Sequence, residues 1–190
     1  PRSSVHGLAF APGGRWLWSA RDKTARAWDL EGGATPRTLE GHTDWVWAIA
    51  CFGFGGRWFI VTASNDKTAR VWDLESGATL RTLQHADQVR GIACFGVAGG
   101  WRIVTGCDDN NAYVFDGESG ARLQTLEGHT GTVRAVACER VDDAWRVATA
   151  SYDHTARVFD VERGASLATL EGHTADVNAI ACVVVARALR

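Results

Sequence analysis

A histidine, a hydroxyl residue, an aspartate and an aromatic residue recur together along this chain at the same offsets. His42 is followed by Thr62 at +20, Asp66 at +24 and Trp72 at +30. The other sets are His85, Thr105, Asp109 and Phe115; His129, Thr149, Asp153 and Phe159; and a shorter first set of Ser19, Asp22 and Trp28. A histidine, a hydroxyl and a carboxylate are the side chains of a nucleophilic catalytic triad, so that chemistry is considered first.

The structural alternative is a hydrogen-bond relay, in which the aspartate accepts from the histidine, the hydroxyl bridges and the indole N–H closes the chain. A catalytic site is normally built once in a protein, whereas this set returns in every unit. A set that each unit carries serves a need of each unit, such as fixing a loop to a strand through satisfied buried polar groups. We therefore interpret the set as structural, and we predict no catalytic residues and no enzymatic activity.

The elements that carry these residues form a longer repeat. The aromatic positions 28, 72, 115 and 159 lie 44, 43 and 44 residues apart. The second repeat divides into four short strands at 46–51, 58–63, 68–74 and 79–83, separated by turn signals rich in Gly, Asn, Asp and Ser. Such a period, with short strands and a Trp-Asp ending, is typical of a β-propeller blade.

The predicted fold is therefore all-β, a propeller of four-stranded antiparallel blades. The chain holds four blades plus one extra strand, which make a partial or open ring. We place the blades at about 1–41, 42–84, 85–128 and 129–172, and the start of a fifth at 173–190, with its strand at 177–182.

Over essentially its whole length the chain resembles the WD-repeat family. The matching residues are Gly41-His42, Gly128-His129, Gly172-His173, the turn residue Asp66 with its equivalents, Trp28-Asp29 and Trp72-Asp73. The resemblance implies that the recurring polar set is the structural tetrad of the family. Phe115 and Phe159 depart from the pattern because they lack the indole donor, and Gln84-His85 replaces Gly-His with one residue deleted.

The resemblance implies a closed ring, usually of seven blades and sometimes of six or eight. Four blades and a strand then require either further blades from a longer parent chain or a second copy of this chain. Both ends stop within a repeat, which favours a fragment of a longer multi-repeat protein. The near-identity of the repeats and the composition rich in Arg, Ala and Gly indicate that this protein is bacterial.

The resemblance also implies where a partner docks, on the narrow face built by the turn before the first strand and the turn between the second and third. Residues at these places vary between repeats: Trp45, Trp47, Arg90, Arg134 and Tyr152. Trp, Tyr and Arg dominate the hot spots of interfaces. We predict a protein- or peptide-binding scaffold that uses these five residues, as the sensor part of a larger signalling protein.

Three alternatives to this interpretation remain open at this point. The first is that Trp47 packs locally beside its blade instead of meeting a partner. The second is that the chain is an enzyme with its active site in the central channel, and the third is that it is a purely structural, self-associating array.

Composition narrows the partners. The net charge is −2, from 20 basic and 22 acidic residues, so the chain lacks the basic footprint of a protein that binds nucleic acid or an anionic membrane. The sequence contains no apolar run of about 18–20 residues, the length that spans a bilayer. We expect no nucleic acid and no membrane among the partners.

Four of the five cysteines occupy one register of the repeat: Cys51, Cys94, Cys138 and Cys182. Equivalent positions of different blades point in different directions, which disfavours disulfides, and the absence of Cys-x-x-Cys disfavours zinc. We interpret these residues as small buried hydrophobes in a cytoplasmic protein. The sequence has no phosphate-binding loop or metalloprotease motif, and we predict no cofactor and no metal.

Overall fold

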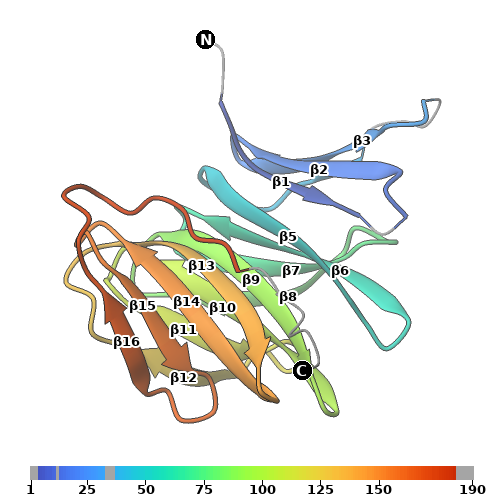
Figure 1. Cartoon of the computed structure of the whole chain (residues 1–190). Coiled ribbons are helices and arrows are strands. Elements are labelled where there is room, and N and C mark those ends of the chain that lie inside the picture. The colour runs from blue at the N-terminus through green and yellow to red at the C-terminus, as the bar shows by residue number, and fades with distance from the viewer. Residues whose placement is uncertain (1–3, 12, 33–36, 183–190) are drawn as a thin grey trace.

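The computed structural model describes residues 4–11, 13–32 and 37–182, and within them the chain forms four antiparallel sheets of four strands each (Figure 1). The strands are β1 (Val5–Phe10), β2 (Trp16–Arg21), β3 (Thr24–Asp29), β4 (Thr38–Leu39), β5 (Val46–Phe54), β6 (Arg57–Ser64), β7 (Thr68–Asp73), β8 (Thr79–Gln84), β9 (Val89–Val97), β10 (Gly100–Cys107), β11 (Ala112–Asp116), β12 (Arg122–Leu126), β13 (Val133–Val141), β14 (Ala144–Ser151), β15 (Ala156–Asp160) and β16 (Ser166–Leu170). Neighbours in each sheet are consecutive in the chain, so each sheet is a meander of hairpins. The predicted all-β blades are confirmed, and we number them blade 1 to blade 4.

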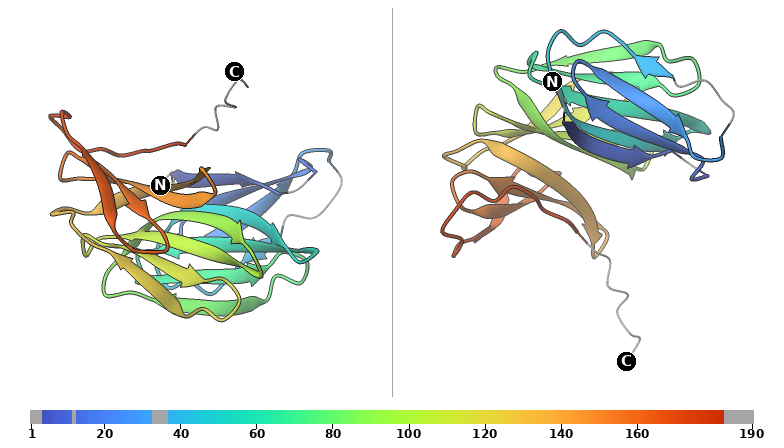
Figure 2. Two further views of the ribbon diagram at one scale, coloured as in Figure 1. Left: turned by 60° about the horizontal axis from the view of Figure 1, so that its bottom comes forward. Right: turned by 90° about the horizontal axis from the view of Figure 1, so that it is seen from above.

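The blades stand side by side in an open arc, with blades 1 and 4 at its ends (Figures 1 and 2). Their first strands, β1, β5, β9 and β13, pack against one another along the inner side. The approach is close, because a Cβ atom added to Gly7 would meet the backbone of Ala48 at 3.2 Å and one added to Gly91 would meet the backbone of Ala135 at 3.1 Å. Glycine at these two positions lets the inner strands lie backbone to backbone.

The hydrophobic core lies between the blades in three clusters. Trp18 and Ile60 meet between blades 1 and 2, Val61 and Ile103 between blades 2 and 3, and Val104 and Val147 between blades 3 and 4, in clusters that each join residues of two blades. Because each inner blade is covered on both faces, its strands carry apolar residues without strict alternation.

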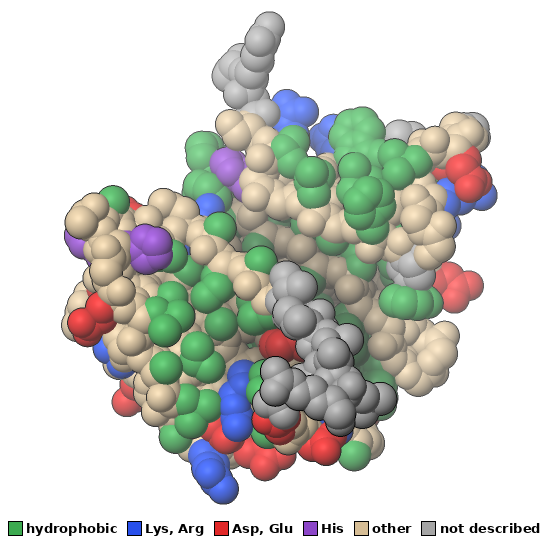
Figure 3. All heavy atoms as spheres, in the orientation of Figure 1, with side chains coloured by type: hydrophobic (Ala, Val, Ile, Leu, Met, Phe, Trp, Pro, Cys, Tyr) green, Lys and Arg blue, Asp and Glu red, His purple; other side chains and the backbone are tan. Residues whose placement is uncertain are grey.

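The two ends of the arc leave apolar positions uncovered. Val5, Leu8 and Phe10, the blade-1 flank, are exposed, and Leu8 shows 61% of its surface. In blade 2 the residues at the first two of these positions, Val46 and Ile49, are buried against blade 1. In Figure 3 hydrophobic side chains gather over blade 1 at the upper right and over blade 4 at the lower left. Exposed leucines of blade 4, Leu167 and Leu170, form the blade-4 flank.

The predicted extra strand at 177–182 is wrong. These residues form no strand, although the N–H of Val177 donates to the carbonyl of Ser151 at 3.0 Å. A strand needs a partner for its ladder, and among the described residues none pairs with this segment. Residues 183–190 lie outside the described part of the chain. Within that part, no helix is long and apolar enough to cross a membrane.

Candidate functional site

In blade 2 the recurring polar set forms one continuous chain of hydrogen bonds, the blade-2 relay. Trp72 Nε1–H donates to Thr62 Oγ1 at 2.8 Å, the Thr62 hydroxyl lies 2.8 Å from His42 Nε2, and His42 Nδ1 lies 2.8 Å from Asp66 Oδ2. With the imidazole proton on Nδ1, every donor in this chain meets an acceptor. The relay ties the loop before β5 and the β6–β7 turn to the strands β6 and β7.

The electrostatics of this relay suit a structural role. Burial lowers the pKa of His42 despite its carboxylate partner, so the imidazole stays neutral at pH 7. Burial alone would raise the pKa of Asp66, but hydrogen bonds from Thr68 and His42 outweigh it and hold the pKa below its usual value. Thr62 is 0% exposed, so its hydroxyl is closed to a substrate.

Blade 4 repeats the arrangement without the indole. His129 Nδ1 lies 2.7 Å from Asp153 Oδ2, and His129 Nε2 lies 2.7 Å from Thr149 Oγ1. Phe159 occupies the place of Trp72 and is buried, and its ring offers no donor. Burial lowers the pKa of His129, and hydrogen bonds led by that from Thr155 lower the pKa of Asp153 against the effect of burial.

Blade 1 keeps the part of the set that its sequence provides. Trp28 Nε1–H donates to Ser19 Oγ at 2.8 Å. Asp22 lies in the β2–β3 turn with φ of 53°, a left-handed conformation that aspartate tolerates better than most residues. Trp28 is partly exposed on the uncovered side of the blade, unlike Trp72.

The predicted hydrogen bond between His85 and Asp109 in blade 3 is absent, so this prediction is wrong. His85 Nε2 lies 2.8 Å from Thr105 Oγ1, but Nδ1–H donates to the carbonyl of Leu83 at 3.1 Å. Asp109 Oδ2 instead accepts from the hydroxyl of Tyr113 at 2.6 Å. Burial lowers the pKa of His85 to about 4.

Two sequence features explain this change of partner. The equivalents of Tyr113 in the other blades are arginines, Arg26, Arg70 and Arg157, so blade 3 alone among the four offers a tyrosine hydroxyl to its turn aspartate. The loop before His85 is one residue shorter than its counterparts. Tyr113 was the available signal, because a phenol four residues after the turn aspartate is a ready donor.

The inner strands carry a second repeated feature, a β-bulge near their start. The pairing register shifts between Val5 and Gly7, between Val46 and Ala48 and between Val133 and Ala135; in blade 3 it shifts opposite Gly106 and Cys107. The extra residues are His6, Trp47, Arg134 and Arg90. Bulges redirect side chains, and these four residues line one hollow of about 250 Å³ beside the inner strands.

Trp47 is the centre of this group. Its ring centroid lies 4.2 Å from that of His6 and 6.1 Å from that of Trp45. The guanidinium carbons of Arg90 and Arg134 lie 4.8 Å and 5.2 Å from the same ring, within cation–π range. We call His6, Trp45, Trp47, Arg90 and Arg134 the mouth cluster.

The structure thus brings together four of the five residues predicted to bind a partner. Trp45 is 50% exposed at the rim of the cluster, whereas Trp47 is half-buried and donates its indole N–H to Asn65 Oδ1. The fifth residue, Tyr152, is exposed and lies at the β14–β15 turn, where its N–H donates to the carbonyl of Thr132 at 3.0 Å. The bulge that aims Trp47 inward was not predicted, because it appears only in the register of the strand pair.

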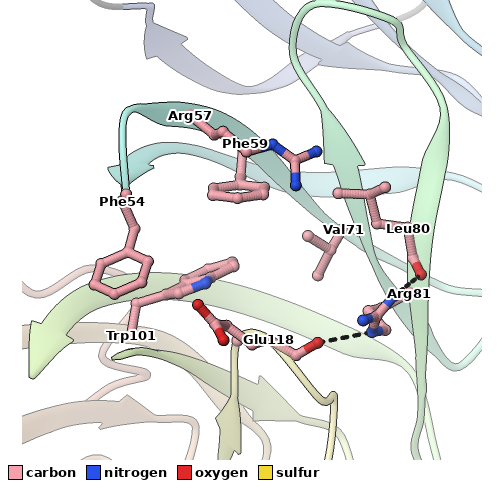
Figure 4. Close-up of a pocket in the computed structure, with 10 residues that line it drawn as sticks. Phe54, Arg57, Phe59, Val71, Leu80, Arg81, Trp101 and Glu118 are labelled. Carbon is pink, nitrogen blue, oxygen red and sulfur yellow. Dashed lines mark hydrogen bonds between the residues drawn. The ribbon is translucent and has the colours of Figure 1, made fainter. Parts of the chain in front are cut away.

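A second hollow, of about 340 Å³, lies at the outer edge between blades 2 and 3 (Figure 4). Its walls include Phe54, Phe59 and Trp101, and the Trp101 ring stacks on Phe59 at 5.0 Å. Gly117 makes room for the indole, because a Cβ atom there would lie 2.2 Å from it. The other blades carry Leu30, Leu74 and Val161 at this position. The walls are mostly apolar, so we interpret this hollow as a feature of blade packing.

The described residues show no other grouping suited to chemistry. Among them, no three His, Cys, Asp or Glu side chains lie together as metal ligands would. The five cysteines are free, and burial raises the pKa of Cys51 and of Cys107 to about 12. Thiols with such pKa values are poor nucleophiles at neutral pH.

Comparison with known proteins agrees with the geometry. The family model described as "WD domain, G-beta repeat" matches residues 1–29, 33–73, 77–116 and 120–160. A stretch of 49 residues is 45% identical to nuclear distribution protein PAC1 of Coprinopsis cinerea, and it covers 26% of this chain and 10% of that relative. The chain therefore matches only a small part of that relative's length.

Proposed function

We propose that this chain, which belongs to the WD-repeat family, is a non-catalytic scaffold that binds a protein or peptide through the mouth cluster and Tyr152. Proteins built from these repeats generally serve as interaction scaffolds, so the class of function follows from the family. The proposal adds to this general class the surface that binds the partner, the mouth cluster with Tyr152. In a larger signalling protein this scaffold would be the sensor part.

One observation carries the proposal: the two sets of polar and aromatic residues differ in their access to solvent. The side chains of the relays are buried, and their hydrogen-bonding groups pair with one another, as those of Thr62 and His42 do. The mouth cluster collects Trp and Arg side chains around an open hollow, with Trp45 half exposed. Trp and Arg at the centre of a contact are the residues whose truncation costs the most binding energy, about 2 kcal/mol or more each.

The experiment is a peptide-array screen with the 190-residue chain, followed by titration of the strongest binders. The double variant Trp45→Ala, Trp47→Ala should lose at least about tenfold in affinity, with an unchanged circular dichroism spectrum. The matched control is Trp58→Ala, an exposed tryptophan at the start of β6 and outside the mouth cluster. Equal affinity of the double variant and the wild type would place binding elsewhere and reject the proposed surface.

The uncovered flanks favour a second proposal, that a second copy of the chain covers them. Blade 1 exposes to solvent the positions that blades 2, 3 and 4 bury against the blade before them. Blade 4 exposes the other half of such an interface, the side of a blade that normally contacts the blade after it. Head-to-tail contacts between two copies would reproduce the internal interfaces and complete a ring.

Sedimentation tests this second proposal. The wild-type chain should form a discrete species near twice 20.5 kDa, and Leu8→Glu with Phe10→Glu should return it to the monomer. Leu123→Glu, an exposed leucine on the outer strand β12, is the control that should leave the assembly intact. A wild-type monomer at all concentrations, or polydisperse aggregates, would reject the completed ring.

A further inference from the structure

Arg134 differs from the other arginine of the mouth cluster in what it contacts. Arg90 donates to Asp108 through Nε at 2.7 Å and through one Nη at 2.6 Å, and it also donates to Asn65 and Gln88. Arg134 donates to the carbonyl of Arg90 at 3.4 Å, and among the described residues it has no ion-pair partner. A guanidinium has five N–H donors in a planar fork, so most of those of Arg134 are available to a ligand.

A single difference between the blades accounts for this. Asp108 directly precedes the turn aspartate of blade 3, and there it neutralises Arg90. The same position of blade 4 holds Tyr152, which has no negative charge at neutral pH. Blade 4 therefore keeps the arginine of blade 3 and lacks its counterion.

The surrounding charges select the sign of a ligand. Asp108 is committed to Arg90, and Oδ1 of Asp176, on the segment after β16, lies 3.5 Å from Nε2 of His154. Two guanidinium groups already lie over the Trp47 ring, so a cationic ligand would meet like charges at this aromatic surface. A carboxylate would instead meet the free fork of Arg134, the geometry that favours two parallel hydrogen bonds.

We propose that the mouth cluster recognises an acidic residue, Asp or Glu, in an extended peptide segment. The carboxylate pairs with Arg134, and apolar side chains next to the acidic residue pack on Trp45 and Tyr152, which are 50% and 39% exposed. This inference rests on the proposed peptide-binding function and adds the chemistry of the partner. The acidic residue is the specificity element, and the aromatic contacts tolerate different neighbours.

The first test uses three pools of fluorescently labelled nonapeptides, degenerate except for a central Glu, Gln or Lys. The Glu pool should bind the 190-residue chain about tenfold more tightly than the Gln pool, and the Lys pool should bind most weakly. The advantage of the Glu pool should shrink as the salt concentration rises, because an exposed ion pair is screened. Peptide binding with equal affinities for the Glu and Gln pools would overturn the inference and leave the proposed function standing. Binding of none of the pools would overturn both.

The second test moves the counterion into the protein. Tyr152→Asp places in blade 4 the residue that neutralises Arg90 in blade 3, so it should abolish the preference for Glu while Arg134 remains in place. Tyr152→Asn removes the same aromatic ring without adding charge, and it should keep the preference. If both variants behave alike, the carboxylate is not what Arg134 recognises.

Arg134→Gln should also remove the preference for Glu. Arg140→Gln changes the charge by the same amount at the far end of β13 and should leave the preference intact. An equal loss in these two variants would indicate a general effect of net charge and contradict a site at Arg134. Tighter binding of a labelled single-stranded oligonucleotide than of the Glu pool would assign the guanidinium to phosphate and reject a peptide carboxylate.

Discussion

The blade-2 relay and the mouth cluster use similar side chains in opposite ways. In the relay, a histidine, a threonine, an aspartate and a tryptophan are buried and complete one another's hydrogen bonds. In the mouth cluster, aromatic rings and guanidiniums surround an open hollow, and Arg134 has no carboxylate partner among the described residues. A polar group whose hydrogen bonds are completed by its own neighbours has a structural task. A polar group at the surface whose hydrogen bonds are incomplete indicates a task that needs a ligand.

Blade 3 shows how the structural task survives sequence change. Its turn aspartate, Asp109, is held by Tyr113 instead of by His85. The donor changed, but the carboxylate in the turn remains hydrogen-bonded. If each blade needs a hydrogen-bonded aspartate in this turn, another residue of the same blade can supply the donor. A catalytic set would not tolerate such a change of donor.

The largest effect should come from Asp66→Ala. This change removes the acceptor of the His42 Nδ1–H, of the Thr68 hydroxyl and of the backbone N–H groups of Thr43 and Thr68 at once, and the free energy of unfolding should fall by about 3 kcal/mol. Asp109→Ala should cost less, because His85 has its own partner in Leu83. Urea unfolding of the two variants measures the difference, and equal losses would show that His42 gains nothing from its carboxylate.

Acidification should produce the next largest effect. The pKa of His85 is about 4 in the folded chain and 6.5 in a model compound, so between these values the unfolded chain binds more protons. Stability is therefore fully present above pH 6.5 and falls as the pH is lowered, and protonation of this residue removes about 2 kcal/mol at pH 5. Urea unfolding across this range should show a shallower slope for His85→Gln, whereas Arg134→Gln should keep the wild-type slope. A wild-type slope in His85→Gln would contradict the attribution of this pH dependence to His85.

Removal of the indole donors should have a smaller effect. Trp72→Phe leaves Thr62 without the Trp72 hydrogen bond and should cost about 1–2 kcal/mol. In the monomeric chain Trp28→Phe should cost about half as much, because Trp28 is there partly exposed on the uncovered side of blade 1. Thermal or urea unfolding compares the pair, and a larger loss for Trp28 would mean that its side of blade 1 is covered in solution.

The smallest effect on stability should come from the mouth cluster. Arg134→Gln should change the free energy of unfolding by no more than about 1 kcal/mol, because the side chain gives up one long hydrogen bond and a cation–π contact. Arg90→Gln should cost more, since it leaves Asp108 without its bidentate partner. The same urea titration tests this order, and a greater loss for Arg134 would make it a framework residue.

Much of the framework was predictable from the sequence because it depends on spacing. The 44-residue period determined the blade, and the offsets from His42 and His129 predicted contacts that are present at 2.7–2.8 Å. The predicted His85–Asp109 contact failed because the repeat spacing does not by itself show that Tyr113, four residues after Asp109, competes as the donor. The segment 177–182 failed as a strand because strand propensity does not supply a pairing partner.

The candidate site was less predictable. The residue types at the mouth cluster pointed to a partner, but the bulges that turn Trp47, Arg90 and Arg134 toward one hollow follow from strand register, which no single strand encodes. The same is true of the contrast between the two arginines, because it depends on which residue of the neighbouring turn each one meets.

Exchange of the side-chain Nε–H protons of arginine, measured by ¹H–¹⁵N NMR on the 190-residue chain, tests most directly whether Arg134 of the mouth cluster is open to a ligand while Arg90 of the same cluster is already held by the protein. The Nε–H of Arg90, which donates to Asp108, should exchange slowly, and that of Arg134 should exchange as fast as in an unstructured peptide. Equal protection of the two protons would show that Arg134 already has an internal partner, and it would contradict the assignment of the mouth cluster as a recognition site.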